Sequence, residues 1–266
     1  MNGSRGAMLP IMAAIMVVFG IIIVGGAWLV FEGPHALAGP IAQRLPPSVG
    51  LALGDKLVYR HRYARRPCDS RAGQAAISTL LYRLHEDLED KPKVEVVVIN
   101  HGAAYAYPVP GDRIIMHKGL IDRARNADDV AAVLAHLIGH VQYRHALAGL
   151  VRQLGPEGVL LYLRDDYNAM RERMAELIAH VARTSFSVEE EELADGWARA
   201  RLTEAGLNPH GFDDFLAHLG KGNRVPMDQR RFISNHRRIG EAPAAPQDAR
   251  PALNDLQWKQ LRSICS

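Results

Sequence analysis

The chain begins with a long apolar stretch, which limits where the rest of the protein can lie. From Ala7 to Phe31 there are 25 residues without a charged side chain, and a helix of about 20 apolar residues crosses a bilayer. Buried helices of water-soluble proteins are usually shorter and amphipathic. We therefore predict an N-terminal transmembrane anchor within residues 1–31. A cleaved signal peptide is the alternative, because Ala36-Leu37-Ala38 resembles a cleavage site, although the apolar part of a signal peptide has about 7–15 residues.

Charge and cysteine content narrow the possible partners and the compartment. The net charge of +3 is too small to indicate a nucleic-acid partner. Arg5 precedes the apolar stretch and Arg44 is the first basic residue after it, which weakly favours an N-terminus inside the cytoplasm and a domain outside it. There Cys68 and Cys265 could form a disulfide, and two free thiols are equally compatible with the sequence.

Hydrophobic periodicity and capping residues predict a mainly helical, α+β domain with a small sheet. Residues 32–70 are expected to be a juxtamembrane segment, since they are rich in Gly, Pro and Arg and 32–67 show no clear helical period. The folded domain is expected over 71–239, and a linker with a C-terminal helix over 240–266. The predicted elements are helices over 72–90, from Asn126 to Gly155 or Pro156, one or two over 157–182, and one from the Ser187/Glu190 capping box to Gly206, with strands at 94–99 and 113–116 and a turn at 108–112.

Four residues of two predicted helices form a candidate metal site. His136 and His140 are four residues apart, so they project from one face of a helix and can hold one Zn²⁺. Glu191 and Asp195 have the same spacing near the start of a later helix. Two histidines and one glutamate, with a position left for water, are the ligands of a catalytic zinc. Asp195 could then hold a ligand histidine by its far nitrogen.

Several fragments around these residues resemble the HtpX-like and CAAX-prenyl-protease-type zinc metallopeptidases, gluzincins of peptidase family forty-eight. The resemblance covers roughly residues 72–240, and His145 also matches a common histidine of the family. The fragments, in the family's order, are Tyr105 to Gly111 (for N-A-F-A-x-P-G), Gly119-Leu120-Ile121 (for G-L-L), Val133 to His140 (for V-L-A-H-E-I-G-H), Glu191 to Asp195 (for E-x-x-x-D), Ala205 to Pro209 (for A-G-Y-D-P) and Ser234-Asn235-His236 (for S-x-H-P, with Arg237 in place of proline).

The resemblance implies a zincin-like fold and assigns roles to these residues. It implies His136, His140 and Glu191 as Zn²⁺ ligands, with Asp195 behind them, and His236 near the metal as a transition-state or switch residue; a loop histidine without a role is the alternative for His236. It also implies an edge strand that pairs with an extended polypeptide. The residues implied for that contact are Tyr105, Tyr107, Pro110 and Gly111.

Leu137 stands where the metallopeptidase motif H-E-x-x-H has its glutamate, the general base. A leucine neither accepts nor donates a proton, and general acid–base catalysis contributes typically 10²–10⁴-fold to rate. A natural loss of the base and an engineered substitution both account for Leu137; because engineers usually choose Gln or Ala, leucine favours a natural loss.

Three functional interpretations follow. The first is a pseudopeptidase that keeps zinc and binds unfolded or partner polypeptides in envelope protein quality control. It would be a single-pass protein of the bacterial inner membrane, with its domain on the extracytoplasmic side. The second is an active zinc endopeptidase with an unconventional base. The third is a metal-free structural interaction domain, against which the retained His136, His140, Glu191 and Asp195 argue.

Overall fold

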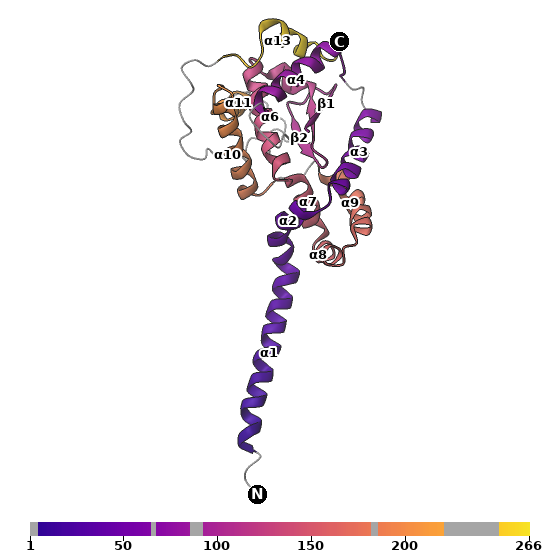
Figure 1. The fold of residues 1–266 in the computed structure, drawn as a ribbon, viewed down its shortest axis with the longest axis vertical. Coiled ribbons are helices and arrows are strands. Elements are labelled where there is room, and N and C mark those ends of the chain that lie inside the picture. Colours follow the sequence, from indigo (N-terminus) through magenta and orange to yellow (C-terminus); the bar gives the residue numbers. More distant parts are fainter. Residues whose placement is uncertain (1–4, 65–67, 86–92, 182–185, 221–249) are drawn as a thin grey trace.

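The computed structural model places a helical domain at one end of a long single helix (Figure 1). It describes residues 5–64, 68–85, 93–181, 186–220 and 250–266. The helices are α1 (Arg5–Phe31), α2 (Gly33–Arg44), α3 (Pro47–Ala64), α4 (Arg71–His85), α5 (Lys118–Arg123), α6 (Ala127–Gln142), α7 (His145–Leu154), α8 (Pro156–Leu163), α9 (Tyr167–Val181), α10 (Val188–Glu204), α11 (Gly211–Gly220) and α13 (Asp255–Arg262). The strands are β1 (Glu95–Ile99), β2 (Ala106–Val109) and β3 (Arg113–His117).

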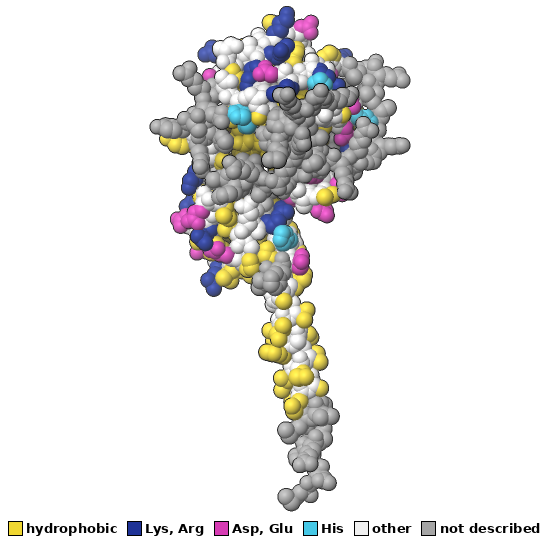
Figure 2. All heavy atoms as spheres, turned by 180° about the vertical axis from the view of Figure 1, so that it is seen from behind, with side chains coloured by type: hydrophobic (Ala, Val, Ile, Leu, Met, Phe, Trp, Pro, Cys, Tyr) yellow, Lys and Arg dark blue, Asp and Glu magenta, His cyan; other side chains and the backbone are white. Residues whose placement is uncertain are grey.

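The helix α1 stands apart from the domain. Residues Ile11–Trp28 are long and apolar enough to cross a membrane, and none of that window is buried. Figure 2 shows hydrophobic side chains along the described part of α1, without a charged side chain among them. An unburied apolar helix of this length is what the sequence predicts for a membrane anchor.

The sheet has the order β1-β3-β2, with β3 parallel to β1 and antiparallel to β2. Neighbouring residues of a strand point to opposite faces of the sheet. Val96 and Val98 of β1 accordingly belong to one apolar cluster, and Val97 and Ile99 belong to the other. Both faces are therefore covered, and this explains why β1 and β3 are almost continuous apolar runs.

Each cluster joins the sheet to its own set of helices. The first cluster contains buried residues of α4, α5, α6, α10, α11 and α13. The second contains buried residues of α2, α3, α7, α8 and α9. In Figure 1 α2, α7, α8 and α9 lie in the half of the domain from which α1 leaves, α3 runs along its side, and α13 lies at the opposite end.

The segment predicted as juxtamembrane, in which residues 32–67 show no clear helical period, contains two helices. These are α2 and α3; their apolar buried residues, such as Ile41 and Leu53, belong to the second cluster, as does Leu45 between the two helices. Two of its prolines lie at helix starts, where a missing N–H does no harm: Pro34 in the first turn of α2 and Pro47 as the first residue of α3. Pro40 lies inside α2. The core thus extends across the boundary predicted at residue 71.

The helix predicted from Asn126 to Gly155 is interrupted. Asn126 caps α6 as predicted, by accepting a hydrogen bond from the Asp129 N–H. However, α6 ends at Gln142 because Arg144 has a left-handed conformation (φ 53°). Its guanidinium donates hydrogen bonds to the carbonyls of Ala42 (3.0 Å) and Leu45 (2.7 Å), so the break ties α6 and α7 to the end of α2.

Several other elements agree with the predictions, whereas α5 and α11 were not predicted, and the turn predicted at 108–112 overlaps the end of β2, where Pro108 and Val109 pair with β3. The predicted helices over 72–90 and 157–182 correspond to α4 and to α8 with α9, and the Ser187/Glu190 capping box opens α10. A disulfide joins Cys68 to Cys265 at the end of the chain, and α13 is the helix expected after Pro251. Of the linker and C-terminal helix predicted over 240–266, residues 240–249 lie outside the described residues.

Candidate metal centre

Two helices in close contact carry the four candidate metal-site residues. His136 and His140 lie on α6, and Glu191 and Asp195 lie on α10. The helices are in close contact at Gly139, where a Cβ atom would lie 2.8 Å from the Ala194 carbonyl oxygen. A side chain at residue 139 would therefore separate the two pairs. The predicted spacing brings all four residues together, and all four are buried.

The three donor atoms are spaced as a tetrahedral metal requires. His140 Nε2 lies 3.0 Å from His136 Nε2 and 3.2 Å from Glu191 Oε2, and His136 Nε2 lies 3.4 Å from the same oxygen. Ligands at about 2.0–2.1 Å from a four-coordinate zinc are about 3.3 Å apart. The buried cluster of His136, His140 and Glu191 could thus hold one metal ion.

The far nitrogens of both histidines have partners that orient the rings. His136 Nδ1 lies 2.9 Å from Asp195 Oδ1, so it donates its proton to the carboxylate and turns the lone pair of Nε2 toward the other donors. His140 Nδ1 lies 2.9 Å from His145 Nδ1. The interruption between α6 and α7 is what turns His145 back toward His140.

The pKa values of these histidines follow from burial and from their neighbours. Burial and the neighbouring His140 lower the pKa of His145 to about 3, so His145 is a neutral hydrogen-bond partner. Burial also opposes the charge on His136, but the hydrogen bonds to Asp195 and Glu191, with the charges of both carboxylates, outweigh burial and raise the pKa of His136. The lone pairs of the His136, His140 and Glu191 donor atoms face one another at close range and repel. They therefore require a positive charge among them, either a metal ion or the proton that His136 takes up.

Two aromatic rings that were not predicted from the sequence stack on the faces of the imidazoles. Phe212 of α11 stacks on His136, with ring centroids 4.1 Å apart and an interplanar angle of 13°. Phe186 stacks on His140, with centroids 4.0 Å apart. No local pattern marks these residues, because only the packing of α11, and of the residues just before α10, against α6 brings them to the site.

Leu137 lies beside His136 in α6 and is buried, with 2% of its surface exposed. It belongs to the first apolar cluster. Burial among apolar side chains is the natural environment of leucine, whereas a carboxylate at that position would need a polar partner. The surroundings of residue 137 thus accommodate a leucine.

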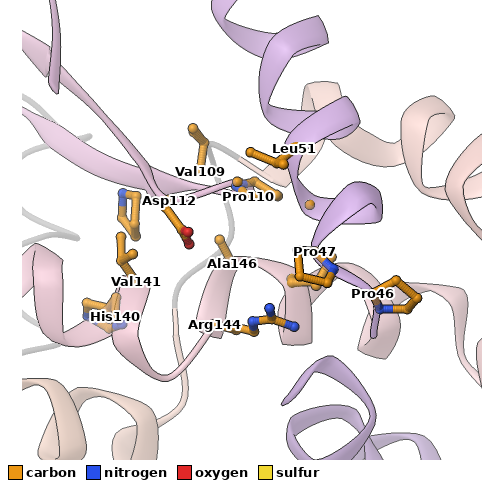
Figure 3. A pocket seen from close by; sticks show the side chains of 14 residues that line it. Pro46, Pro47, Leu51, Val109, Pro110, Asp112, His140, Val141, Arg144 and Ala146 are labelled. Carbon is orange, nitrogen blue, oxygen red and sulfur yellow. The ribbon is translucent and has the colours of Figure 1, made fainter. Parts of the chain in front are cut away.

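A small cavity of about 70 Å³ lies beside the site, between the start of α3, the turn from β2 to β3, and the end of α6 (Figure 3). Pro110 and Gly111 line it together with His140. Gly111 has φ +78°, and a Cβ atom there would lie 2.7 Å from the Gly50 carbonyl oxygen, so only glycine fits this turn. Of the four residues implied for polypeptide contact, two therefore lie at this cavity. Tyr105 and Tyr107 instead pack around His117, with ring centroids 5.8 and 6.1 Å from it.

The outer edge of β2 lacks one hydrogen-bond donor, at Pro108. The His117 N–H donates to the Tyr105 carbonyl, and hydrogen-bonded residues alternate along an antiparallel pair. Tyr107 therefore also faces β3, whereas the backbone groups of Ala106 and Pro108 point to the outer edge. Pro108 has no N–H, and it stands where the family hairpin N-A-F-A-x-P-G has alanine. This departure is visible in the sequence, but its meaning depends on the strand register.

Comparison with known proteins identifies the family. The model of peptidase family M48 matches residues 73–241, which is more than half of the chain. The chain belongs to this family. Its members are zinc-dependent metallopeptidases, so the predicted fold class and family are confirmed.

Two relatives illustrate how much of the chain is shared. The mitochondrial metalloendopeptidase OMA1 of Arabidopsis thaliana is 28% identical over 127 residues, which are 48% of this chain and 26% of that protein. The beta-barrel assembly-enhancing protease of Escherichia coli is 27% identical over 183 residues, which are 62% of this chain and 36% of that protein. The chain thus matches about a third or less of the length of these relatives.

His236, the remaining predicted site residue, lies outside the described residues.

Proposed function

We propose that this protein is a membrane-anchored pseudopeptidase that holds zinc at His136, His140 and Glu191 and acts by binding polypeptides. The observation that carries the proposal is the buried Leu137 beside a complete, correctly spaced donor set. Ligand geometry and partners are retained, whereas the group that would move the proton is missing.

The chemistry of the site supports a loss of hydrolysis rather than a loss of metal. Zinc supplies Lewis-acid activation of a water molecule when it is bound. The chain must then take a proton from that water and deliver it to the leaving amine. Glu190 does not serve, because it pairs with Arg152 (2.6 Å) and with the Ser187 N–H (2.8 Å). His145 does not serve either, because it is held by His140 Nδ1, on the far side of that ring from the donor atoms.

Polypeptide binding is proposed from the cavity at His140 and from the family's polypeptide substrates. A strand added to β2 would accept a hydrogen bond from Ala106 and donate one to the Pro108 carbonyl, but it would find no donor at Pro108. We expect Pro108→Ala to strengthen the binding of an extended peptide by one hydrogen bond, about 2- to 12-fold. Pro156→Ala, an exposed position at the start of α8, controls for removing a proline, and equal affinities of the two variants would contradict this mode.

The compartment is proposed from the same features. The Cys68–Cys265 disulfide is typical of an oxidising compartment, and Arg5 before the anchor favours a cytoplasmic N-terminus. Relatives include a bacterial protease named for β-barrel assembly. We place the domain on the extracytoplasmic side of the bacterial inner membrane, where it would take part in envelope protein quality control.

The experiment compares three full-length chains in detergent with zinc: the native protein, Leu137→Glu and Leu137→Gln. Cleavage of an unfolded protein is followed, with thermal unfolding as the control for folding. We expect only Leu137→Glu to cleave and a chelator to stop it, because glutamine has a similar size but is no base. Cleavage by the native chain at a rate close to that of Leu137→Glu would overturn the proposal in favour of an active endopeptidase with another base.

A further inference from the structure

The outward face of α8 is apolar. Pro156, Leu160 and Leu163 are exposed, with 46% and 70% exposure for the two leucines. Their spacing places them on one face of the helix. The inward side of α8 is already in use, since Val159 is buried in the second cluster and Tyr162 packs against that cluster. The exposed leucines are therefore not needed for the core.

The place of α8 in the fold puts this face next to the anchor. Helix α8 packs on α2, and α2 follows α1 directly along the chain. Hydrogen bonds from the Glu32 N–H to the Trp28 carbonyl and from the Ala36 N–H to the Glu32 carbonyl carry helical bonding across the α1–α2 junction. The junction is therefore a stiff connection. Figure 1 shows α8 at the end of the domain from which α1 leaves.

The flanking residues suit the boundary between lipid and water. Glu157 lies in the first turn of α8, and Arg164 and Asp165 directly follow the helix. All three are exposed, so their charges can stay among headgroups and water while the leucines enter the bilayer. Trp28, half exposed at the end of the apolar window of α1, is of the residue type that concentrates at this boundary.

We infer that the outward face of α8 lies in the membrane interface when α1 spans the bilayer. The occupant of the face is lipid, because the face lies at the end of the domain from which the apolar, unburied α1 leaves, and it carries charges only at its rim. The domain would then rest on the membrane at two places, α1 and α8, with α13 pointing away from it. This inference depends on α1 as an anchor and is independent of the proposed loss of hydrolysis.

The test uses the full chain in lipid vesicles with one added cysteine that carries an environment-sensitive dye. The test position is Leu163→Cys on α8. The matched control is Leu256→Cys on α13, which is 65% exposed at the opposite end of the domain. Val24→Cys, 70% exposed on α1, reports insertion of the anchor. The native cysteines are joined in the disulfide, so the added thiol is labelled under non-reducing conditions.

We expect brominated lipids to quench the dye at residues 24 and 163 at least about twofold more than at residue 256. Equal quenching at 163 and 256 would overturn the inference. A blue-shifted dye at 163 that brominated lipids do not quench would also overturn it, because a protein, such as a second copy, would then cover the face. Absence of quenching at residue 24 would show that α1 does not enter the bilayer, and it would overturn the inference as well. Leu163→Asp, at a largely exposed position, should reduce quenching of a dye at Leu160→Cys without unfolding the protein.

Discussion

Replacing Gly139 with alanine tests whether the contact between α6 and α10 sets the metal site. The added Cβ would lie 2.8, 2.9 and 3.2 Å from the oxygen, Cα and carbonyl carbon of Ala194. All three are backbone atoms of α10, so no side chain can rotate away, and the helices must separate by roughly 0.5–1 Å to reach ordinary contact distance. Overpacking of this kind costs about 1–3 kcal/mol.

The separation would act directly on the donor atoms. Glu191 and Asp195 move with α10, so the distances from Glu191 Oε2 to the two histidine nitrogens, now 3.2 and 3.4 Å, would exceed those of a tetrahedral zinc. We therefore expect Gly139→Ala to lower the thermal unfolding midpoint by roughly 2–12 °C and to weaken zinc binding, measured by competition with a chelating dye.

Gly196→Ala is the matched control. Gly196 lies in the same helix α10, and a Cβ there would meet nothing within 4 Å. Because alanine favours a helix over glycine, this variant should gain about 0.5–1 kcal/mol of stability and keep its zinc affinity. Equal midpoints and zinc affinities in Gly139→Ala and Gly196→Ala would refute the argument from helix contact.

Three further predictions concern the same centre and the end of the chain. Asp195→Asn should weaken zinc binding about 10- to 100-fold, because the amide no longer carries the charge that orients His136; unchanged affinity in a chelator titration would speak against this role. The raised pKa of His136 means that its proton stabilises the metal-free protein fully below the ordinary histidine pKa, and that this stability is lost as pH rises through the raised value. Zinc displaces the proton, so it should bind more tightly as pH rises from 6 to 8. A zinc affinity that does not change with pH would contradict the assignment. Replacing Cys68 and Cys265 together by serine should cost about 2–5 kcal/mol of unfolding free energy in denaturant titrations, and a loss well below that range would show that the link is dispensable.

The elements with strong local signals could be predicted from the sequence. The capping boxes and the β-branched run act through residues a few positions apart, so Ser187 with Glu190 marks the start of α10, and 94–99 marks β1. The helices α2 and α3 were missed because their composition imitates a loop, and their stability comes from packing in the second cluster. The break at Arg144 was missed because a positive φ at an arginine is compensated by tertiary hydrogen bonds to α2.

The candidate site also has residues that the sequence predicts and residues that only the packing shows. His136, His140, Glu191 and Asp195 are predictable because each pair is four residues apart on a helix, and a shared metal explains both pairs. The stacking of Phe186 and Phe212 on the imidazoles is visible only once α11 and the residues just before α10 are packed against α6. Likewise, proline at 108 is evident in the sequence, but its effect on the outer edge of β2 follows from the register with β3.

The central claim is that the site holds zinc but lacks a group that transfers the proton. It is tested most directly on one preparation of the native full-length chain. Bound zinc is counted in the purified protein, and cleavage of an unfolded substrate is measured in the same sample beside Leu137→Glu. We expect one zinc per chain, removable by a chelator and lost in His136→Ala, together with cleavage at least about 100-fold slower than that of Leu137→Glu. A native chain that carries no zinc, or one that cleaves as fast as Leu137→Glu, would contradict the account.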